Sequence, residues 1–191
     1  MTTNCSAPTN PRRLLVYLGA TMPQNVLYVQ AVQQLGEEIA RRGLDLVYGG
    51  SHEGTMTVLC DAVLQNGGRA IGVFPKTLPP EFLYNGLTET YVTPDILERK
   101  RKMLELADVV ITMPGSFGTW DELFDALEQE KVEVLHGRTP KPIGVLNLLG
   151  YYDGVLQLLD RSILDGYTTK EYRSLLTVAD NIPDLLDALL A

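Results

Sequence analysis

The sequence predicts an α/β protein with a doubly wound, Rossmann-like parallel sheet flanked by helices. Short apolar segments alternate along the chain with longer amphipathic ones, as strands alternate with helices in such folds. The short segments are apolar throughout rather than at every second residue, which is typical of parallel strands covered on both faces. Glycine-rich turns follow several of these segments, at the sheet edge where ligands bind in this class.

The strands are predicted where a short run rich in Val, Ile, Leu and Tyr ends at a glycine, a proline or a polar turn. These runs cover residues 14–18, 44–48, 70–74, 88–92, 108–113, 142–147 and 175–179. Residues 75–87 contain three prolines and are expected to form a loop.

The helices are predicted where apolar residues recur every three or four positions. These segments cover residues 28–42, 55–65, 96–107, 120–134, 151–164 and 182–190. We expect residues 12–191 to form a single Rossmann-like nucleotide-binding domain. Residues 1–11, which are small and polar, are expected to form a flexible tail.

Composition narrows the classes of function. The chain of 191 residues is 45% hydrophobic and carries a net charge of 16 − 24 = −8, which makes it a poor electrostatic partner for nucleic acid. No apolar run approaches the roughly 20 residues of a membrane helix, so no membrane association is expected. Cys5 and Cys60 have neither metal-ligand nor disulfide spacing, and we predict a cytoplasmic protein without a bound metal or cofactor.

The turn from Gly115 to Thr119, in the stretch MPGSFGTWDEL, is the strongest candidate for a site. Glycines let the backbone approach a ligand closely, and the free N–H groups of a following first helical turn attract an anion. Gly115, Ser116, Phe117, Gly118 and Thr119 are therefore predicted to bind a phosphate group. The alternative is a tight turn required only by the backbone.

Asp121 and Glu122 follow this turn. Acids in a first helical turn are favoured by the helix dipole, which is a purely structural explanation. Two carboxylates beside a phosphate loop would nevertheless repel the anion. A carboxylate is useful there if positive charge develops during a reaction, as it does in cleavage of a glycosidic bond.

The only dense basic run is Glu98-Arg99-Lys100-Arg101-Lys102. It is either the solvated face of a helix or a source of one inward-pointing cation. Arg99 lies one turn before the apolar Met103 on the same helical face, so Arg99 is the residue expected to point toward the sheet end. Two other glycine turns should lie at that edge, and from them we select Gly19, Thr21, Gly50 and Ser51 as substrate-binding residues.

These motifs resemble the "Lonely guy" family, whose hallmark is PGGxGTxxE with an upstream ERK. Here the corresponding residues are Pro114–Glu122 and Glu98-Arg99-Lys100. Further similarity extends from about Val16 to Leu189. The sequence departs from the family pattern at positions close to the motifs, namely Ser116, Asp121, Glu128 and the pair Ile96-Leu97.

The resemblance implies hydrolysis of the N-glycosidic bond of nucleoside 5′-monophosphates, such as AMP and the cytokinin riboside monophosphates, to a free base and ribose 5-phosphate. It implies Arg99 and Glu122 as catalytic residues. It also implies substrate contacts by Glu81, Lys100 and Asp121, and a homodimer with the site near the subunit interface.

Two other hypotheses remain open at this point. The first is a non-catalytic carrier of a nucleotide or a phosphorylated cofactor, similar to the molybdenum-cofactor carriers. The second is a DNA-handling module, which the charge of −8 disfavours.

Overall fold

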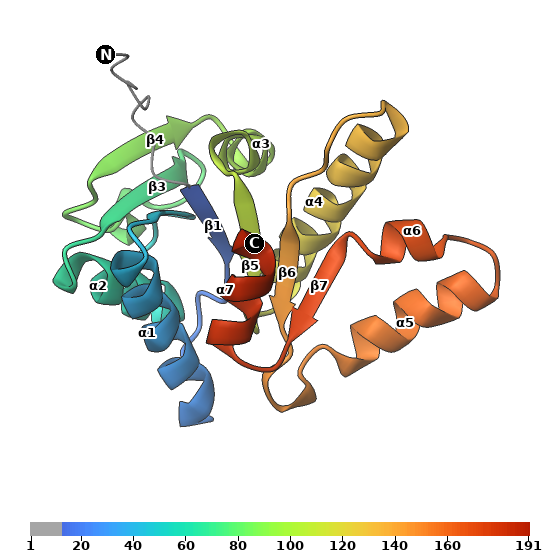
Figure 1. Ribbon diagram of the computed structural model, residues 1–191. Helices are drawn as coiled ribbons and strands as arrows, with labels where there is room; N and C mark the ends of the chain where they lie inside the picture. Colours follow the sequence, from blue (N-terminus) through green and yellow to red (C-terminus); the bar gives the residue numbers. More distant parts are fainter. Residues whose placement is uncertain (1–12) are drawn as a thin grey trace, which may run out of the picture.

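The computed structural model describes residues 13–191, and the expected tail at residues 1–11 lies outside this range (Figure 1). One parallel seven-stranded sheet has the order β4-β3-β2-β1-β5-β6-β7. Its strands are β1 Arg13–Tyr17, β2 Asp45–Tyr48, β3 Arg69–Pro75, β4 Glu89–Thr93, β5 Val109–Thr112, β6 Ile143–Leu146 and β7 Leu176–Ala179. The predicted doubly wound α/β fold is confirmed.

Helices cover both faces of the sheet. They are α1 Val26–Arg41, α2 Gly54–Gln65, α3 Ile96–Leu106, α4 Phe117–Leu135, α5 Asp153–Leu164, α6 Lys170–Arg173 and α7 Ile182–Leu190, with short 3₁₀ turns η1 Pro80–Phe82 and η2 Leu148–Gly150. Helices α1, α2 and α7 pack on one face, while α3 and α4 pack on the other. Among residues 13–191, no helix is long and apolar enough to cross a membrane.

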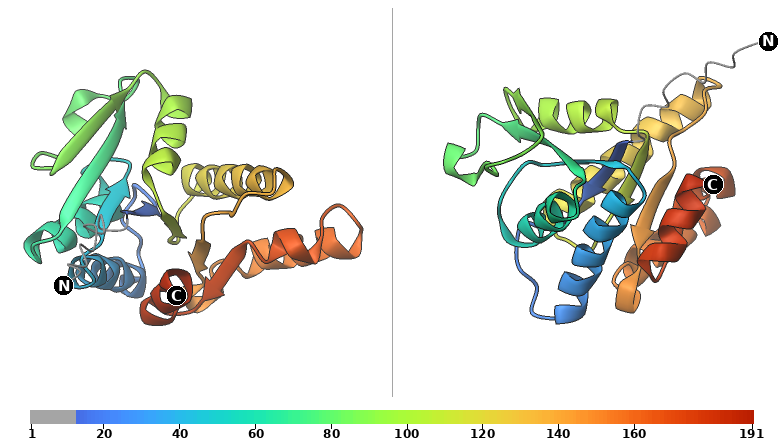
Figure 2. Two further views of the ribbon diagram at one scale, coloured as in Figure 1. Left: turned by 45° about the horizontal axis from the view of Figure 1, so that its top comes forward. Right: turned by 60° about the vertical axis from the view of Figure 1, so that its left-hand side comes forward.

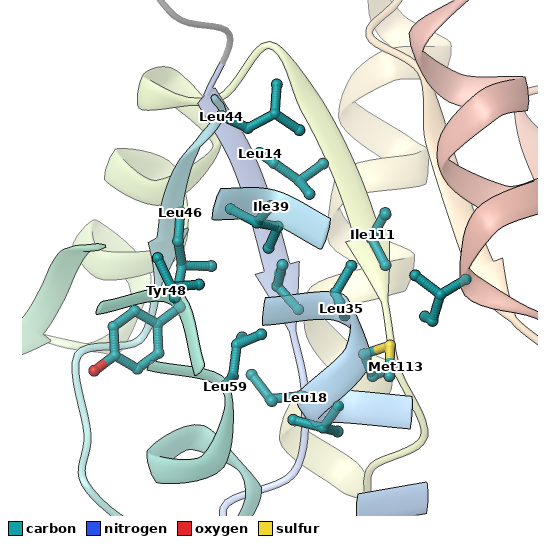
Figure 3. Packing of buried hydrophobic residues seen from close by; sticks show 14 of the residues in the cluster. Leu14, Leu18, Leu35, Ile39, Leu44, Leu46, Tyr48, Leu59, Ile111 and Met113 are labelled. Atoms are coloured by element: carbon teal, nitrogen blue, oxygen red, sulfur yellow. The ribbon is translucent and has the colours of Figure 1, made fainter. Parts of the chain in front are cut away.

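The core on the first face shows why the strand segments are apolar throughout (Figure 3). Leu35 and Ile39 of α1 and Leu59 of α2 are fully buried against the sheet. On the other face, Met103 of α3 and Leu123 of α4 are fully buried in a second apolar cluster. Burial of this kind supplies the main stabilising free energy of the fold, at about 25 cal/mol per Å² of apolar area.

The sheet contains one topological switch point. β1 pairs in parallel with β2 on one side and with β5 on the other, and the chain builds the two halves of the sheet outward from this pair. The turns after β1 and β5 therefore separate at their carboxyl ends, which is where open α/β sheets bind ligands.

The helix ranges agree with the predicted ones to within two residues, except at the start of α4 and at α6. α4 begins at Phe117 rather than Trp120, with Ser116 as its N-cap. The predicted turn extends to Thr119, but the first turn of the helix accommodates the glycine at position 118. α6 was not predicted, since four residues are too few to show a helical period.

Candidate functional site

A cavity of about 340 Å³ opens at the carboxyl ends of β1 and β2, between α3 and α4. Arg99 and Glu122, which come from different helices, lie beside each other in its wall. Its apolar wall consists of Met56 from α2, Met103 from α3, and Leu78 and Phe82 from the loop after β3. The cavity thus combines a buried ion pair with an apolar surface.

Arg99 points inward, as its position relative to Met103 predicted. Its Nε donates a hydrogen bond to the carbonyl oxygen of Val73 at 3.0 Å, and its Nη1 lies 3.7 Å from Oε1 of Glu122. The two side chains are only 14% and 12% exposed. Gly49 makes room for the guanidinium, because a Cβ added there would overlap Arg99.

Glu122 sits one helical turn beyond the start of α4 and has an altered acidity. Burial raises the pKa of its carboxyl group to about 7, and the negative charges of Asp121 and Asp125 add to this rise. The positive charges of Arg99 and Lys100 act in the opposite direction. A carboxyl group with such a pKa can exchange a proton near neutral pH, as catalytic acids and bases do.

The starts of α2 and α4 both lie at this cavity, and within residues 13–191 no side chain caps either of them. By contrast, Asn25 caps α1 and Asp95 caps α3 through side-chain hydrogen bonds. The first-turn N–H groups of α4, at Gly118 and Thr119, are thus available to an anion.

Close packing explains why the first residue of the turn between β5 and α4, Gly115, is a glycine. A Cβ at Gly115 would overlap the side chain of Thr119, which is itself buried. The turn after β5 therefore folds back on the first turn of α4, and glycine permits that approach.

Lys100 lies next to Arg99 but has a different environment. Its buried Nζ lies 2.9 Å from Oδ2 of Asp121 and 3.8 Å from Oδ2 of Asp125. This ion pair joins α3 to α4 outside the cavity. Of the residues for which the family resemblance implied substrate contact, Lys100 and Asp121 thus bind each other rather than line the cavity.

The remaining predicted binding residues separate into three groups. Those lining the cavity are Gly19, Ser51, Ser116, Gly118 and Thr119. Thr21 and Gly115 line a second cavity next to it. Gly50, Glu81 and Phe117 line neither of these two cavities. Phe117 is 82% exposed and packs edge-on against Trp120, with 5.3 Å between ring centroids.

Sequence reasoning missed several residues of the cavity wall. Tyr17 ends β1 there, and burial together with the charge of Glu122 raises the pKa of its hydroxyl well above the usual value. Its position two residues before Gly19, a predicted binding residue, could have identified Tyr17 as a residue of the site. Leu78 and Phe82 gave no signal, because they lie in the proline-rich loop.

Backbone hydrogen bonds position that loop. The His52 N–H donates to the Phe82 carbonyl at 2.9 Å, and the Tyr84 N–H donates to the Gly50 carbonyl at 2.8 Å. Ser51 and Leu83 form an isolated antiparallel bridge between these contacts. The loop after β3 is thereby fixed to the glycine turn after β2.

Sequence comparison gives a consistent family. A family model described as "Possible lysine decarboxylase" matches residues 56–189. The probable cytokinin riboside 5′-monophosphate phosphoribohydrolase LOGL5 of Oryza sativa subsp. japonica is 34% identical over 176 residues, which are 92% of this chain and 70% of that protein. The cytokinin riboside 5′-monophosphate phosphoribohydrolase LOG2 of Arabidopsis thaliana is 32% identical over 179 residues, covering 93% and 82% of the two chains.

Structure comparison finds the same fold in proteins of lower sequence identity. The molybdenum cofactor carrier protein of Chlamydomonas reinhardtii superposes with a TM-score of 0.70 at 21% identity, over 95% of this chain and 97% of the other. The molybdenum cofactor binding protein of Rippkaea orientalis gives 0.68 at 20% identity, over 96% and 99%. At this level of identity the likeness establishes the fold alone.

Proposed function

This chain belongs to the family matched by the possible lysine decarboxylase model, whose compared members are named cytokinin riboside 5′-monophosphate phosphoribohydrolases, and we propose that it hydrolyses the N-glycosidic bond of nucleoside 5′-monophosphates. The products are a free base and ribose 5-phosphate. The observation that carries this proposal is the buried Arg99–Glu122 pair, which lies in the cavity beside the uncapped start of α4.

The proposed roles follow from this arrangement. The 5′-phosphate binds the N–H groups of Gly118 and Thr119 and the hydroxyl groups of Ser116 and Thr119. The sugar then lies along α4 toward Glu122, which is one turn further on. The apolar wall of the cavity receives the flat base.

Cleavage breaks the bond between C1′ and the base nitrogen, and the electron pair leaves with the base. The ionised carboxylate of Glu122 stabilises the positive charge that develops on the sugar. Water then adds to C1′ and gives a proton to Glu122, and Glu122 passes this proton to the departed base nitrogen, which regenerates the carboxylate. Arg99, held by the Val73 carbonyl, orients the carboxylate.

A direct assay tests this proposal. The protein is incubated with AMP and with isopentenyladenosine monophosphate, and the free base is quantified by chromatography. Base release from either nucleotide supports the proposal, and the relative rates identify the preferred base. If no base is released while AMP still raises the melting temperature, the carrier function is correct instead, since a bound ligand stabilises the folded state.

We expect kcat/KM to rise about tenfold per pH unit below pH 7 and to level off above it. The reaction requires ionised Glu122, whose pKa is raised to about 7. Titration of the substrate phosphate, with a second pKa of about 6, would give a similar rise. The Asp125→Asn variant separates the two causes.

Asp125 raises the pKa of Glu122, so the Asp125→Asn variant should move the rising limb to lower pH. If the rising limb stays at the same pH in this variant, the limb is due to titration of the substrate phosphate. A kcat/KM that is constant between pH 5 and 8 would contradict the role of Glu122.

We also propose a homodimer that buries the face formed by α4 and α5. Helix α5 is amphipathic, yet none of its residues is buried, and Phe124, Leu158 and Leu164 are exposed. Figures 1 and 2 show α4 and α5 extending past the sheet on the same side of the molecule. Light scattering should give about twice the chain mass of 21.1 kDa, and a monomer would contradict this proposal.

The free, buried Cys60 supports the proposed cytoplasmic location.

A further inference from the structure

A second cavity, of about 330 Å³, adjoins the first and has no part in the proposed reaction. Tyr28 and Val32 of α1 line one side, and Tyr151, just before α5, lines another. Pro23 and Pro114 complete an apolar wall. The two cavities are nearly equal in volume, and each is of the size that holds one nucleoside-sized group.

The two cavities adjoin each other at the carboxyl end of the sheet, beside the switch point. Residues after β1 and β5 line both of them, whereas Arg99 and Glu122 line only the first and Tyr28 and Tyr151 line only the second. Gly19 and Ser116 belong to both linings, so these two residues form the boundary between the two spaces. Rossmann-like sheets bind the two halves of a dinucleotide across such a crevice, with the phosphates at its centre.

The chemistry of the second cavity suits a flat, uncharged group. Its lining contains no charged side chain. The rings of Tyr28 and Tyr151 meet edge-on, with 5.8 Å between their centroids. The Tyr151 hydroxyl donates to the Gly115 carbonyl, and the Thr55 hydroxyl donates to the Gly19 carbonyl. These bonds occupy the hydroxyl groups of Tyr151 and Thr55, and the two tyrosines give the cavity an aromatic lining suited to a flat ligand.

We propose that this second cavity binds a flat group joined to the nucleotide through its 5′-phosphate, so that the complete ligand is a pyrophosphate-linked dinucleotide. The nucleotide half occupies the first cavity, and that part rests on the proposed function. Ser116, at the start of α4, lines both cavities, while Gly118 of α4 lines the first and Thr55 of α2 lines the second. Each helix start can hold one of the two phosphates.

The test compares AMP, ADP and diadenosine 5′,5′-diphosphate by titration calorimetry. All are measured on the Glu122→Gln variant, in which turnover should be absent. Occupation of the second cavity should make the dinucleotide bind about tenfold more tightly than ADP, since stacking one base on aromatic side chains has an effect of that size. Equal affinity for the dinucleotide and ADP would overturn the proposal without any further variant.

Substitution of Tyr28 tests whether the second base of the dinucleotide binds in the second cavity. Tyr28→Ala should abolish the advantage of the dinucleotide over ADP and leave AMP affinity unchanged within about twofold, whereas Tyr28→Phe should retain the advantage. An advantage that survives Tyr28→Ala would place the second base elsewhere and overturn the proposal. Base release from AMP by the wild-type protein is measured separately, so failure of the hydrolytic function and failure of the second site give different results.

Discussion

Replacement of Glu122 by glutamine should lower kcat for AMP cleavage by about 10³-fold while AMP binding persists. Loss of one group that stabilises transition-state charge in a buried site has an effect of this order. Glutamine retains the shape of the side chain beside Arg99, and in the proposed binding mode the phosphate is held by the start of α4 instead. Chromatography of the free base gives kcat, and the rise in melting temperature with AMP reports binding.

Stability provides an internal check on this variant. The pKa of Glu122 is raised in the folded state, so its contribution to stability is present at acidic pH and is lost as pH rises through about 7. A neutral glutamine avoids that loss, and the variant should melt no lower than the wild type at pH 8. A lower melting temperature would show that pairing with Arg99 outweighs burial.

Glu128→Gln is the matched control on the same helix. Glu128 is exposed and pairs with Lys131, away from the first cavity. This variant should retain wild-type turnover. Wild-type turnover in Glu122→Gln would contradict the proposed mechanism.

The Gly49→Ala variant should lose about 10²-fold in kcat/KM. The added Cβ would overlap the Arg99 guanidinium and contact the end of Met56. Arg99 would have to leave its position between the Val73 carbonyl and Glu122. Displacement of a positioning group by about 1 Å has an effect of this size, and steady-state kinetics measure it.

Gly154→Ala is the corresponding control for glycine replacement. A Cβ at Gly154 meets no atom within 4 Å, and alanine favours the helix in which this residue lies. Its kinetics should match the wild type. If Gly49→Ala also retained wild-type kcat/KM, the position of Arg99 described above would not be required for the reaction.

Local patterns predicted most of the fold. The central strands are short apolar runs because both faces of the sheet are covered there, as the burial of Leu15 and Val110 on one face and Leu46 and Ile111 on the other shows. The ends of helices depended instead on cap geometry, which single residues do not determine. For this reason the start of α4 was placed three residues late.

Site residues could be predicted from the sequence only where an unusual local pattern occurs together with a helical spacing that gives the direction of the side chain. Arg99 could be assigned an inward direction because it shares a face with Met103. Lys100 could not, since its pairing with Asp121 depends on how α3 packs against α4. The contribution of Phe82 depends on backbone contacts to residues about 30 positions earlier, and no local pattern encodes them.

The loop between β3 and β4 also bears on how substrate preference can diverge. Its attachment to the turn after β2 uses main-chain atoms at His52, Phe82, Gly50 and Tyr84, so these hydrogen bonds do not depend on which side chains stand at positions 78 and 82. Arg99 and Glu122, the pair proposed to act in catalysis, come from α3 and α4. Under the proposed function, substitutions at positions 78 and 82 should therefore change the shape of the base pocket without disturbing this pair, so that base preference can evolve separately from catalysis.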